Sequence, residues 1–260
     1  MLLVILLIGH MVADYFLQSS NMAENKKNHI NVLLAHSGIY FLTFIIIDFL
    51  FFQPWFAVWT TLIISVTHFF IDLIRTKIDN KFKDYRVRFL AFLFDQVLHT
   101  SIIVATYYLL NLSAKVNSIY SACKGFPNFN KILLYCLLFV ILLDPTAVFI
   151  KKLFAFIFKN EEPNNNLGNN AGSIIGKLER IITAILLLGN QYSVIGLVLT
   201  AKSIARFKQL EDKDFAEKYL IGTLLSLSIS LILTLLIKYI LTLSGFIITI
   251  LFGCNMKQKK

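Results

Sequence analysis

The chain of 260 residues is 57% hydrophobic and only 15% charged, and its mean hydropathy is +0.71. These values exclude an ordinary soluble domain. Apolar runs of about 18 residues or more recur along the chain, so we predict an all-α, polytopic helical membrane protein with about seven or eight membrane segments. The net charge of +10 comes from Lys and Arg in short loops and the tail, which indicates contact with anionic membrane lipids and no nucleic-acid partner.

The first half of the chain contains five apolar segments. They are expected at residues 1–18, 30–52, 54–74, 88–111 and 131–157. The first lacks the basic start and small-residue cleavage site of a signal peptide, so we interpret it as a retained helix. Asp144-Pro145 is expected to kink the fifth. The basic connections 19–29 and 75–88 are assigned to the cytoplasm, which places the N-terminus outside.

The domain organisation follows from a polar interruption. Residues 1–157 are predicted to form an N-terminal membrane bundle, 158–177 a flexible loop and 178–260 the C-terminal membrane segments. Residues 181–201 could span the membrane or form a re-entrant hairpin turning at Gly189-Asn190-Gln191. Residues 219–253 are too long for one ordinary span, and Lys238 is expected to break them.

Three His/Asp pairs, each spaced four residues apart, lie inside the apolar segments. They are His10 with Asp14, His68 with Asp72, and Asp95 with His99. On a helix this spacing places both side chains on one face. A charged group at the bilayer centre costs about 2.5–3.5 kcal/mol or more, so a bound cation, a proton relay or a water-lined cavity is expected to offset it.

The pairs and His36 share a similar depth, because their distances from the basic loops place them within about 10–15 Å of the cytoplasmic surface. Imidazole and carboxylate together are ligands of Zn²⁺, Mn²⁺ or Fe²⁺, so a divalent metal is the expected cofactor. A single His in a membrane helix is more often an interhelical hydrogen-bond partner, which is the structural alternative. The predicted metal ligands are His10, Asp14, His36, His68, Asp72, Asp95 and His99.

Catalytic and substrate-binding roles are also predicted from the sequence. The predicted catalytic residues are Asp14, Asp72, Asp95 and Gln96. Gln18 and Lys26 are expected to contact the substrate. Lys202 and Arg206, one helical turn apart, could clamp an anionic substrate, although snorkelling of helix-end side chains is the alternative.

Five motifs occur in order along the first part of the chain. They are His10-Met-Val-Ala-Asp14-Tyr-Phe-Leu-Gln18, Met22-Ala23 with Lys26, Leu34-Ala35-His36, His68-Phe69-Phe70-Ile71-Asp72 and Asp95-Gln96-Val97-Leu98-His99. Together they resemble the bacterial integral membrane family known as domain of unknown function 3307, most strongly over residues 1–110. The C-terminal half also resembles the longer members. The resemblance implies a multi-pass protein of the bacterial cell (inner) membrane, but no biochemistry.

Three functional hypotheses remain open. The leading one is a metal-dependent membrane hydrolase acting on a lipid-linked or phosphate-bearing substrate. The second is a transporter or channel that uses the same residues as a proton or cation pathway. The third is a membrane scaffold for a soluble partner. Bound metal would favour the first, and no feature of the sequence indicates the oligomeric state.

Overall fold

The computed structural model describes the backbone of residues 1–159 and 170–257 and the side chains of residues 1–159 and 172–243. These residues form helices and connecting turns, which confirms the all-α class. Among the described residues, five helical segments are long and apolar enough to cross a membrane, so the expected count of seven or eight is not confirmed. They are α3 (Ile30–Phe51), α4 (Pro54–Lys81), α5 (Tyr85–Leu109), the segment Phe129–Phe158, and Lys213–Leu243. Two shorter apolar helices, Leu2–Phe16 and Tyr192–Ala205, accompany them.

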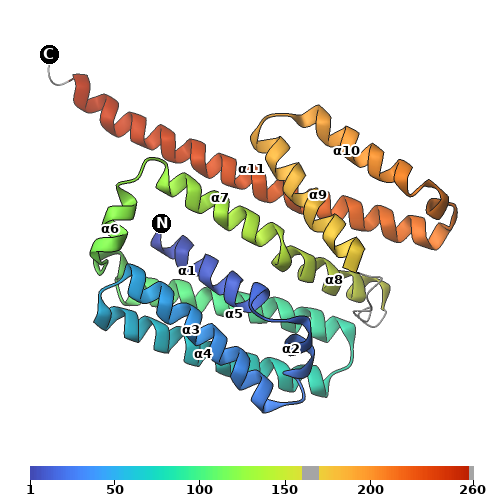
Figure 1. Ribbon diagram of the computed structural model, residues 1–260, viewed down its shortest axis with the longest axis horizontal. Helices are drawn as coiled ribbons and strands as arrows, with labels where there is room; N and C mark the ends of the chain where they lie inside the picture. The colour runs from blue at the N-terminus through green and yellow to red at the C-terminus, as the bar shows by residue number, and fades with distance from the viewer. Residues whose placement is uncertain (160–169, 258–260) are drawn as a thin grey trace. The chain divides into compact units, whose positions relative to one another are not determined.

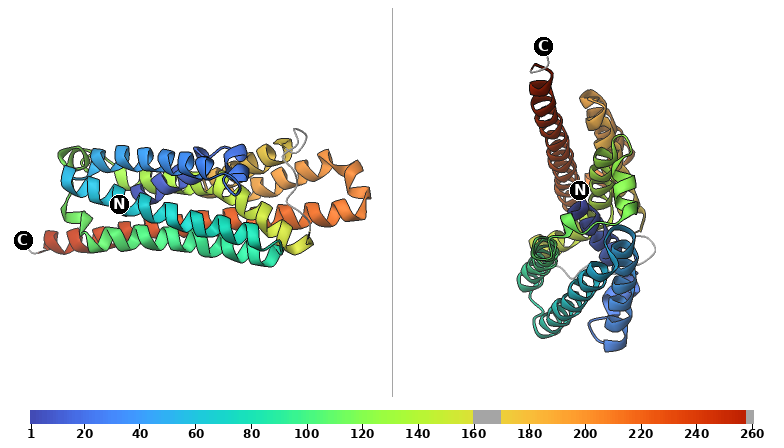
Figure 2. Two further views of the ribbon diagram at one scale, coloured as in Figure 1. Left: turned by 90° about the horizontal axis from the view of Figure 1, so that it is seen from below. Right: turned by 90° about the vertical axis from the view of Figure 1, so that its left-hand side faces the viewer.

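The chain divides into two compact units, Met1–Asn169 and Asn170–Lys260. In the first unit α3, α4 and α5 run side by side, and α1 (Leu2–Met11) packs against α3, α5 and α7 (Phe129–Leu142) (Figures 1 and 2). Gly9 allows α1 to approach α3 closely, because a Cβ there would lie 2.5 Å from Ile47 Cδ1. Leu6 and Phe44 are fully buried between these helices. α1 is therefore enclosed by longer helices.

The connections of the first unit explain where its helices begin and end. Pro54 opens α4, where its missing N–H costs nothing, and the Gln53 N–H donates to the Lys115 carbonyl at 2.9 Å. α4 continues to Lys81, past the expected end at residue 74, so the expected basic loop 75–88 is mostly helical. The reason is local, since Arg75 and Asp79 form an i,i+4 ion pair at 2.8 Å that supports the last turns.

The expected kink at Asp144-Pro145 separates two helices. α7 ends at Leu142 and α8 (Asp144–Phe158) begins at Asp144. Only Leu143, at ψ −103°, lies between them. Pro145 has no N–H to continue the helical ladder. The Thr146 hydroxyl donates to the Ile141 carbonyl at 2.7 Å and so satisfies an acceptor near the break.

The second unit contains α9 (Asn170–Leu188), α10 (Tyr192–Ala205), a short 3₁₀ turn (Phe207–Glu211) and α11 (Lys213–Lys257). A hairpin does turn at residues 189–191, where Asn190 has φ 59°. The expected break at Lys238 is wrong, because α11 is one helix of 45 residues and the Lys238 ammonium donates to the Asn190 side chain. Of the expected loop 158–177, residues 160–169 lie outside the described residues, and α9 begins at Asn170.

Candidate metal centre

Four buried histidines and three buried aspartates of the first unit meet between α1 with its following turn, α3, α4 and α5. Each histidine of the set is at most 2% exposed. Because its members come from different helices, the cluster is a product of tertiary packing. Its members are His10, Asp14, His36, His68, Asp72, Asp95 and His99.

Asp14 enters the cluster through a distortion of the first helix. Residues Val12–Phe16 form a π-helical turn directly after α1. A π turn contains more residues than an α turn, so Asp14 is rotated relative to the position that i,i+4 spacing predicts from His10. Asp14 Oδ1 lies 3.3 Å from His36 Nε2, whereas His10 Nδ1 lies 3.1 Å from the Tyr40 hydroxyl. The two members of the first predicted pair thus have different partners.

Three ligand-type atoms from α3 and α4 form a closed triangle. His36 Nε2 is 3.2 Å from His68 Nε2 and 3.4 Å from Asp72 Oδ2, and the third side, from His68 Nε2 to Asp72 Oδ2, is 3.8 Å. Tetrahedral zinc with bonds of about 2.0–2.2 Å has ligand–ligand separations of about 3.3–3.6 Å. The triangle is therefore close in size to one face of a zinc coordination shell, with one side slightly longer.

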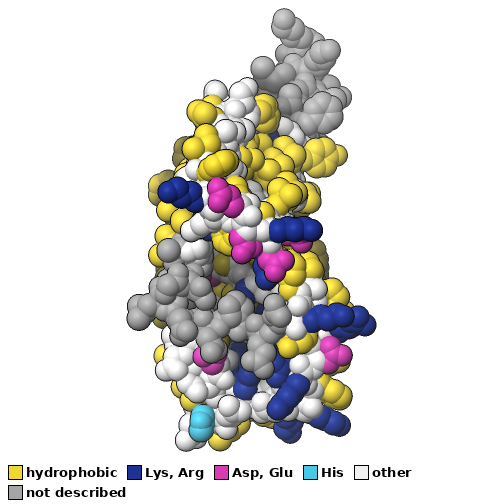
Figure 3. All heavy atoms as spheres, turned by 90° about the vertical axis from the view of Figure 1, so that its right-hand side faces the viewer, with side chains coloured by type: hydrophobic (Ala, Val, Ile, Leu, Met, Phe, Trp, Pro, Cys, Tyr) yellow, Lys and Arg dark blue, Asp and Glu magenta, His cyan; other side chains and the backbone are white. Residues whose placement is uncertain are grey.

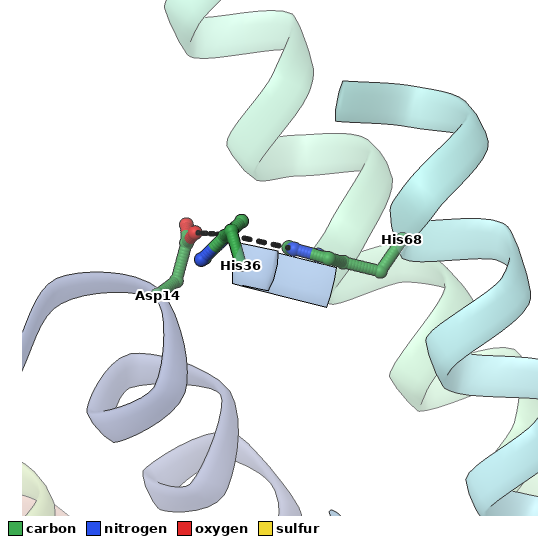
Figure 4. Close-up of side chains that lie close together, drawn as sticks. All are labelled: Asp14, His36 and His68. Carbon is green, nitrogen blue, oxygen red and sulfur yellow. Dashed lines mark hydrogen bonds and ion pairs between the residues drawn. The ribbon is translucent and has the colours of Figure 1, made fainter. Parts of the chain in front are cut away.

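Asp14 extends this group from the other side of His36. Figure 4 shows Asp14, His36 and His68 approaching from three helices, with contacts from Asp14 to His36 and from His36 to His68. Ligand atoms of these three buried residues all lie within 4.8 Å of one another. Three or four oxygen and nitrogen atoms can thus surround one cation.

A second group of ligand atoms shares two residues with the first. His68, Asp72 and His99 also lie within 4.8 Å of one another, and His68 Nδ1 is 3.2 Å from His99 Nδ1. His99 Nε2 lies 3.9 Å from Asp72 Oδ1 and 3.5 Å from Asp95 Oδ1. Histidine and aspartate side chains in contact with one another thus extend from α3 through α4 to α5.

Polar side chains predicted as catalytic or substrate contacts surround the carboxylates. Lys26 donates to Asp72 Oδ2 at 2.7 Å, and Gln96 donates to Asp14 Oδ2 at 3.3 Å and to Asp95 Oδ2 at 3.1 Å. In the amide orientation that satisfies its neighbours, Gln18 accepts from Lys26 at 3.0 Å and donates to the Asp14 carbonyl at 3.2 Å. Gln18, Lys26 and Gln96 therefore lie at the cluster.

The ammonium of Lys26 remains charged there. Burial alone would lower the pKa of Lys26, but the carboxylates of Asp72 and Asp14 more than offset this effect and raise the pKa of Lys26 above its usual value. Lys26 follows the short helix α2 (Ser20–Asn25), whose N-cap Ser19 accepts from the Met22 N–H at 3.2 Å. This capped turn returns the chain toward α4 and brings a permanent cation to Asp72.

Tyr40 is a site residue that the sequence patterns did not indicate. Its ring stacks on His68 with the centroids 3.6 Å apart and the planes 7° from parallel, and its hydroxyl contacts His10. It contacts two histidines at once, as residues that orient metal ligands do. The available signal was its position one turn after His36, on the same face of the helix.

Lys202 and Arg206 belong to the second unit. Lys202 donates to Glu179 at 2.6 Å and to Thr223 at 3.2 Å. Lys202 and Arg206 also lie over the ring of Tyr219, at 5.2 and 5.8 Å from its centroid. Their nearest described partners are thus an acid, a hydroxyl and an aromatic ring, and their role as an anion clamp stays a prediction.

Fold and site together define a helical protein with five segments able to cross a membrane and a buried His/Asp cluster. Residues 2–126 match the family described as "Protein of unknown function (DUF3307)", which confirms the resemblance predicted from the motifs. The match includes every residue of the cluster, from His10 to His99. The resemblance expected for the C-terminal half lies outside the matched residues. No curated protein and no solved structure matches the chain.

Proposed function

We propose that the protein is a multi-pass metalloprotein of the bacterial cell (inner) membrane, with a divalent cation, Zn²⁺, Mn²⁺ or Fe²⁺, in the His/Asp cluster near the cytoplasmic face. It acts as a hydrolase on a lipid-linked or phosphate-bearing substrate. The observation that carries this proposal is the triangle of His36 Nε2, His68 Nε2 and Asp72 Oδ2, whose sides of 3.2, 3.4 and 3.8 Å fit three protein ligands with one position open, as in catalytic zinc sites.

The charge of the cluster supports a divalent ion. With the histidines neutral, as metal ligation requires, ionised Asp14, Asp72 and Asp95 carry three negative charges and Lys26 supplies one positive charge. Two negative charges therefore remain in a site whose residues are all nearly buried. Unbalanced buried charge is very costly. One divalent cation would neutralise it.

The carboxylates have different surroundings, which suggests different roles. Asp14 and Asp95 keep 8% exposure, against 2% for Asp72, so they are the more exposed carboxylates of the cluster. The ion would polarise a phosphoryl or acyl oxygen and promote ionisation of water. Asp95, held by Gln96 at 3.1 Å, is then placed to exchange a proton with water. Lys26, which donates to Asp72, would direct a remaining N–H to an anionic substrate group.

Basic residues at the same end of the first unit suit a phosphate-bearing substrate or an anionic lipid. Lys27 lies 3.9 Å from Asp79, and Arg88 donates to the Asp79 carbonyl at 3.3 Å. Further lysines follow at positions 77, 81 and 83. Lys and Arg side chains gather over the lower part of this end (Figure 3). Such a rim attracts polyanionic headgroups.

Metal analysis of detergent-purified protein tests the proposal. Protein from metal-supplemented cells should contain at least about one equivalent of Zn, Mn or Fe, and His36→Gln and Asp72→Asn should lose it. The matched controls are His29→Gln, at an exposed histidine, and Asp48→Asn, at a buried carboxylate that accepts from Thr61 at 2.7 Å. A metal-free wild type, or equal metal content in His36→Gln and His29→Gln, would refute a metal site.

A proton or cation pathway is the second candidate. It is favoured by the histidine contacts, His36 Nε2 to His68 Nε2 and His68 Nδ1 to His99 Nδ1, both 3.2 Å, because imidazoles in series can relay a proton. Proteoliposomes with an internal pH dye distinguish the two functions. Metal-independent proton flux that His68→Ala abolishes would support the pathway and overturn the hydrolase.

A further inference from the structure

Two buried polar atoms beside the triangle have no hydrogen-bond partner within the part of the chain that the structure describes. They are His99 Nε2 and Asp95 Oδ1. They lie 3.5 Å apart, within ion-pair range of each other, but neither makes a hydrogen bond to a described residue, which is costly in a buried site. A separation of this size is also the one that two ligands of a single cation show.

The carboxylate of Asp72 connects these atoms to the triangle. Its Oδ2 lies 3.4 Å from His36 Nε2 and 3.8 Å from His68 Nε2, whereas its Oδ1 lies 3.9 Å from His99 Nε2. Its two oxygens thus contact different histidines. A carboxylate with this arrangement can hold two cations, one on each oxygen.

We propose that His99, Asp95 and Asp72 Oδ1 bind a second divalent cation, so that Asp72 bridges a two-metal centre. The proposal rests on the first cation position proposed above. In two-metal hydrolytic sites the ions lie about 3.5–4 Å apart, a spacing that one bridging carboxylate provides. His10 offers a further ligand, because its Nε2 is also buried without a hydrogen-bond partner among the described residues and its ring centroid lies 5.4 Å from that of His99.

The second ion identifies the class of substrate. With one divalent ion the cluster is neutral, and with two it carries two positive charges, which match the two negative charges of a phosphate monoester. Water would provide the nucleophile: its OH forms the new bond to phosphorus, the P–O bond to the alcohol breaks, and the proton of the water leaves with the alcohol oxygen. The reaction needs no other reagent.

Manganese titration with electron paramagnetic resonance tests the second position. Metal-free wild-type protein should bind about two Mn²⁺ per chain, with the spectrum of an isolated ion at one equivalent and an exchange-coupled spectrum at two. Asp95→Asn and His99→Gln should bind one ion and never show coupling. Asp48→Asn, the same substitution at a buried carboxylate bound to Thr61, should still bind two.

The outcomes separate this inference from the function on which it rests. One ion in the wild type, unchanged by Asp95→Asn, would overturn the second position and keep the first. No bound ion would overturn both. A coupled spectrum that survives Asp95→Asn would overturn the assigned ligands. If the variants fail to fold, the wild-type titration decides alone, because an uncoupled spectrum at two equivalents refutes the bridging carboxylate.

Discussion

Replacing Lys26 by Met distinguishes two interpretations of the cluster, a cation-binding site and a structural network of ion pairs. The Lys26 ammonium lies 2.7 Å from Asp72 Oδ2, and a cation on the same oxygen would be bound at about 2.1 Å. The ammonium and the cation would then be at most about 5 Å apart. At an effective dielectric constant of about 20, a monovalent and a divalent charge at that distance repel by several kcal/mol.

The same substitution also removes the partner of a buried carboxylate. Asp72 is 3% exposed at its side chain, so metal-free Lys26→Met should lose about 3–5 kcal/mol of stability. A bound cation would replace the missing charge and relieve much of that loss. We therefore expect Lys26→Met to bind Mn²⁺ or Zn²⁺ at least about tenfold more tightly than wild type, because tenfold corresponds to only about 1.4 kcal/mol.

The assay is a thermal-shift series with a chelator competition titration. Added metal should raise the melting temperature of Lys26→Met more than that of wild type, since ligand binding stabilises the folded state according to its affinity. Lys27→Met is the matched control, because the neighbouring lysine is 3.9 Å from Asp79 and more exposed. Unchanged or weaker metal affinity in Lys26→Met would refute the assignment of Asp72 as a ligand.

Four further predictions concern the cluster, its support and its orientation. His68→Ala should reduce the metal-dependent rise in melting temperature, because it removes a ligand of the first proposed cation and keeps those of the second. A rise equal to that of wild type would exclude His68 as a ligand. Tyr40→Phe should cost about 0.5–1.5 kcal/mol in a denaturation series, because it removes the contact with His10 Nδ1 and keeps the ring on His68. Phe44→Ala should cost about 3–5 kcal/mol, whereas the exposed control Phe49→Ala should change little. Cys123 should react with an impermeant maleimide from outside intact cells, and labelling only after permeabilisation would invert the proposed topology.

The helices could be predicted from the sequence where hydropathy and proline decide them. The apolar runs located α3, α4 and α5, Pro54 marked a turn, and Pro145 marked a break. The predicted helix ends were wrong where charged residues were taken to indicate a loop or a break. Arg75 and Asp79 extend α4 because they pair with each other at 2.8 Å, and Lys238 is accommodated within α11 because Asn190 accepts from its ammonium. Charged residues with such partners are compatible with a continuing helix.

The residues that form the cluster could be predicted from the sequence, but their contacts across helices could not. Within-helix spacing correctly placed His68 beside Asp72 at 3.8 Å and His99 beside Asp95 at 3.5 Å. It did not place Asp14 beside His36, because that contact depends on a π turn and on the packing of α1 against α3. Contacts across helices depend on tertiary packing, about which periodicity carries no information.

The early end of the first helix explains the contacts of both Asp14 and Lys26. α1 and its π turn end at Phe16, so the chain leaves the helical ladder beside the cluster and returns through α2. The turn brings Lys26 to Asp72, which is 46 residues away in sequence, and the π geometry directs Asp14 to His36. An uninterrupted helix through residues 12–26 would rotate Asp14 back toward the face of His10 and carry Lys26 away from Asp72. The irregular backbone at 12–19 therefore determines both the charge and the ligand set of the centre.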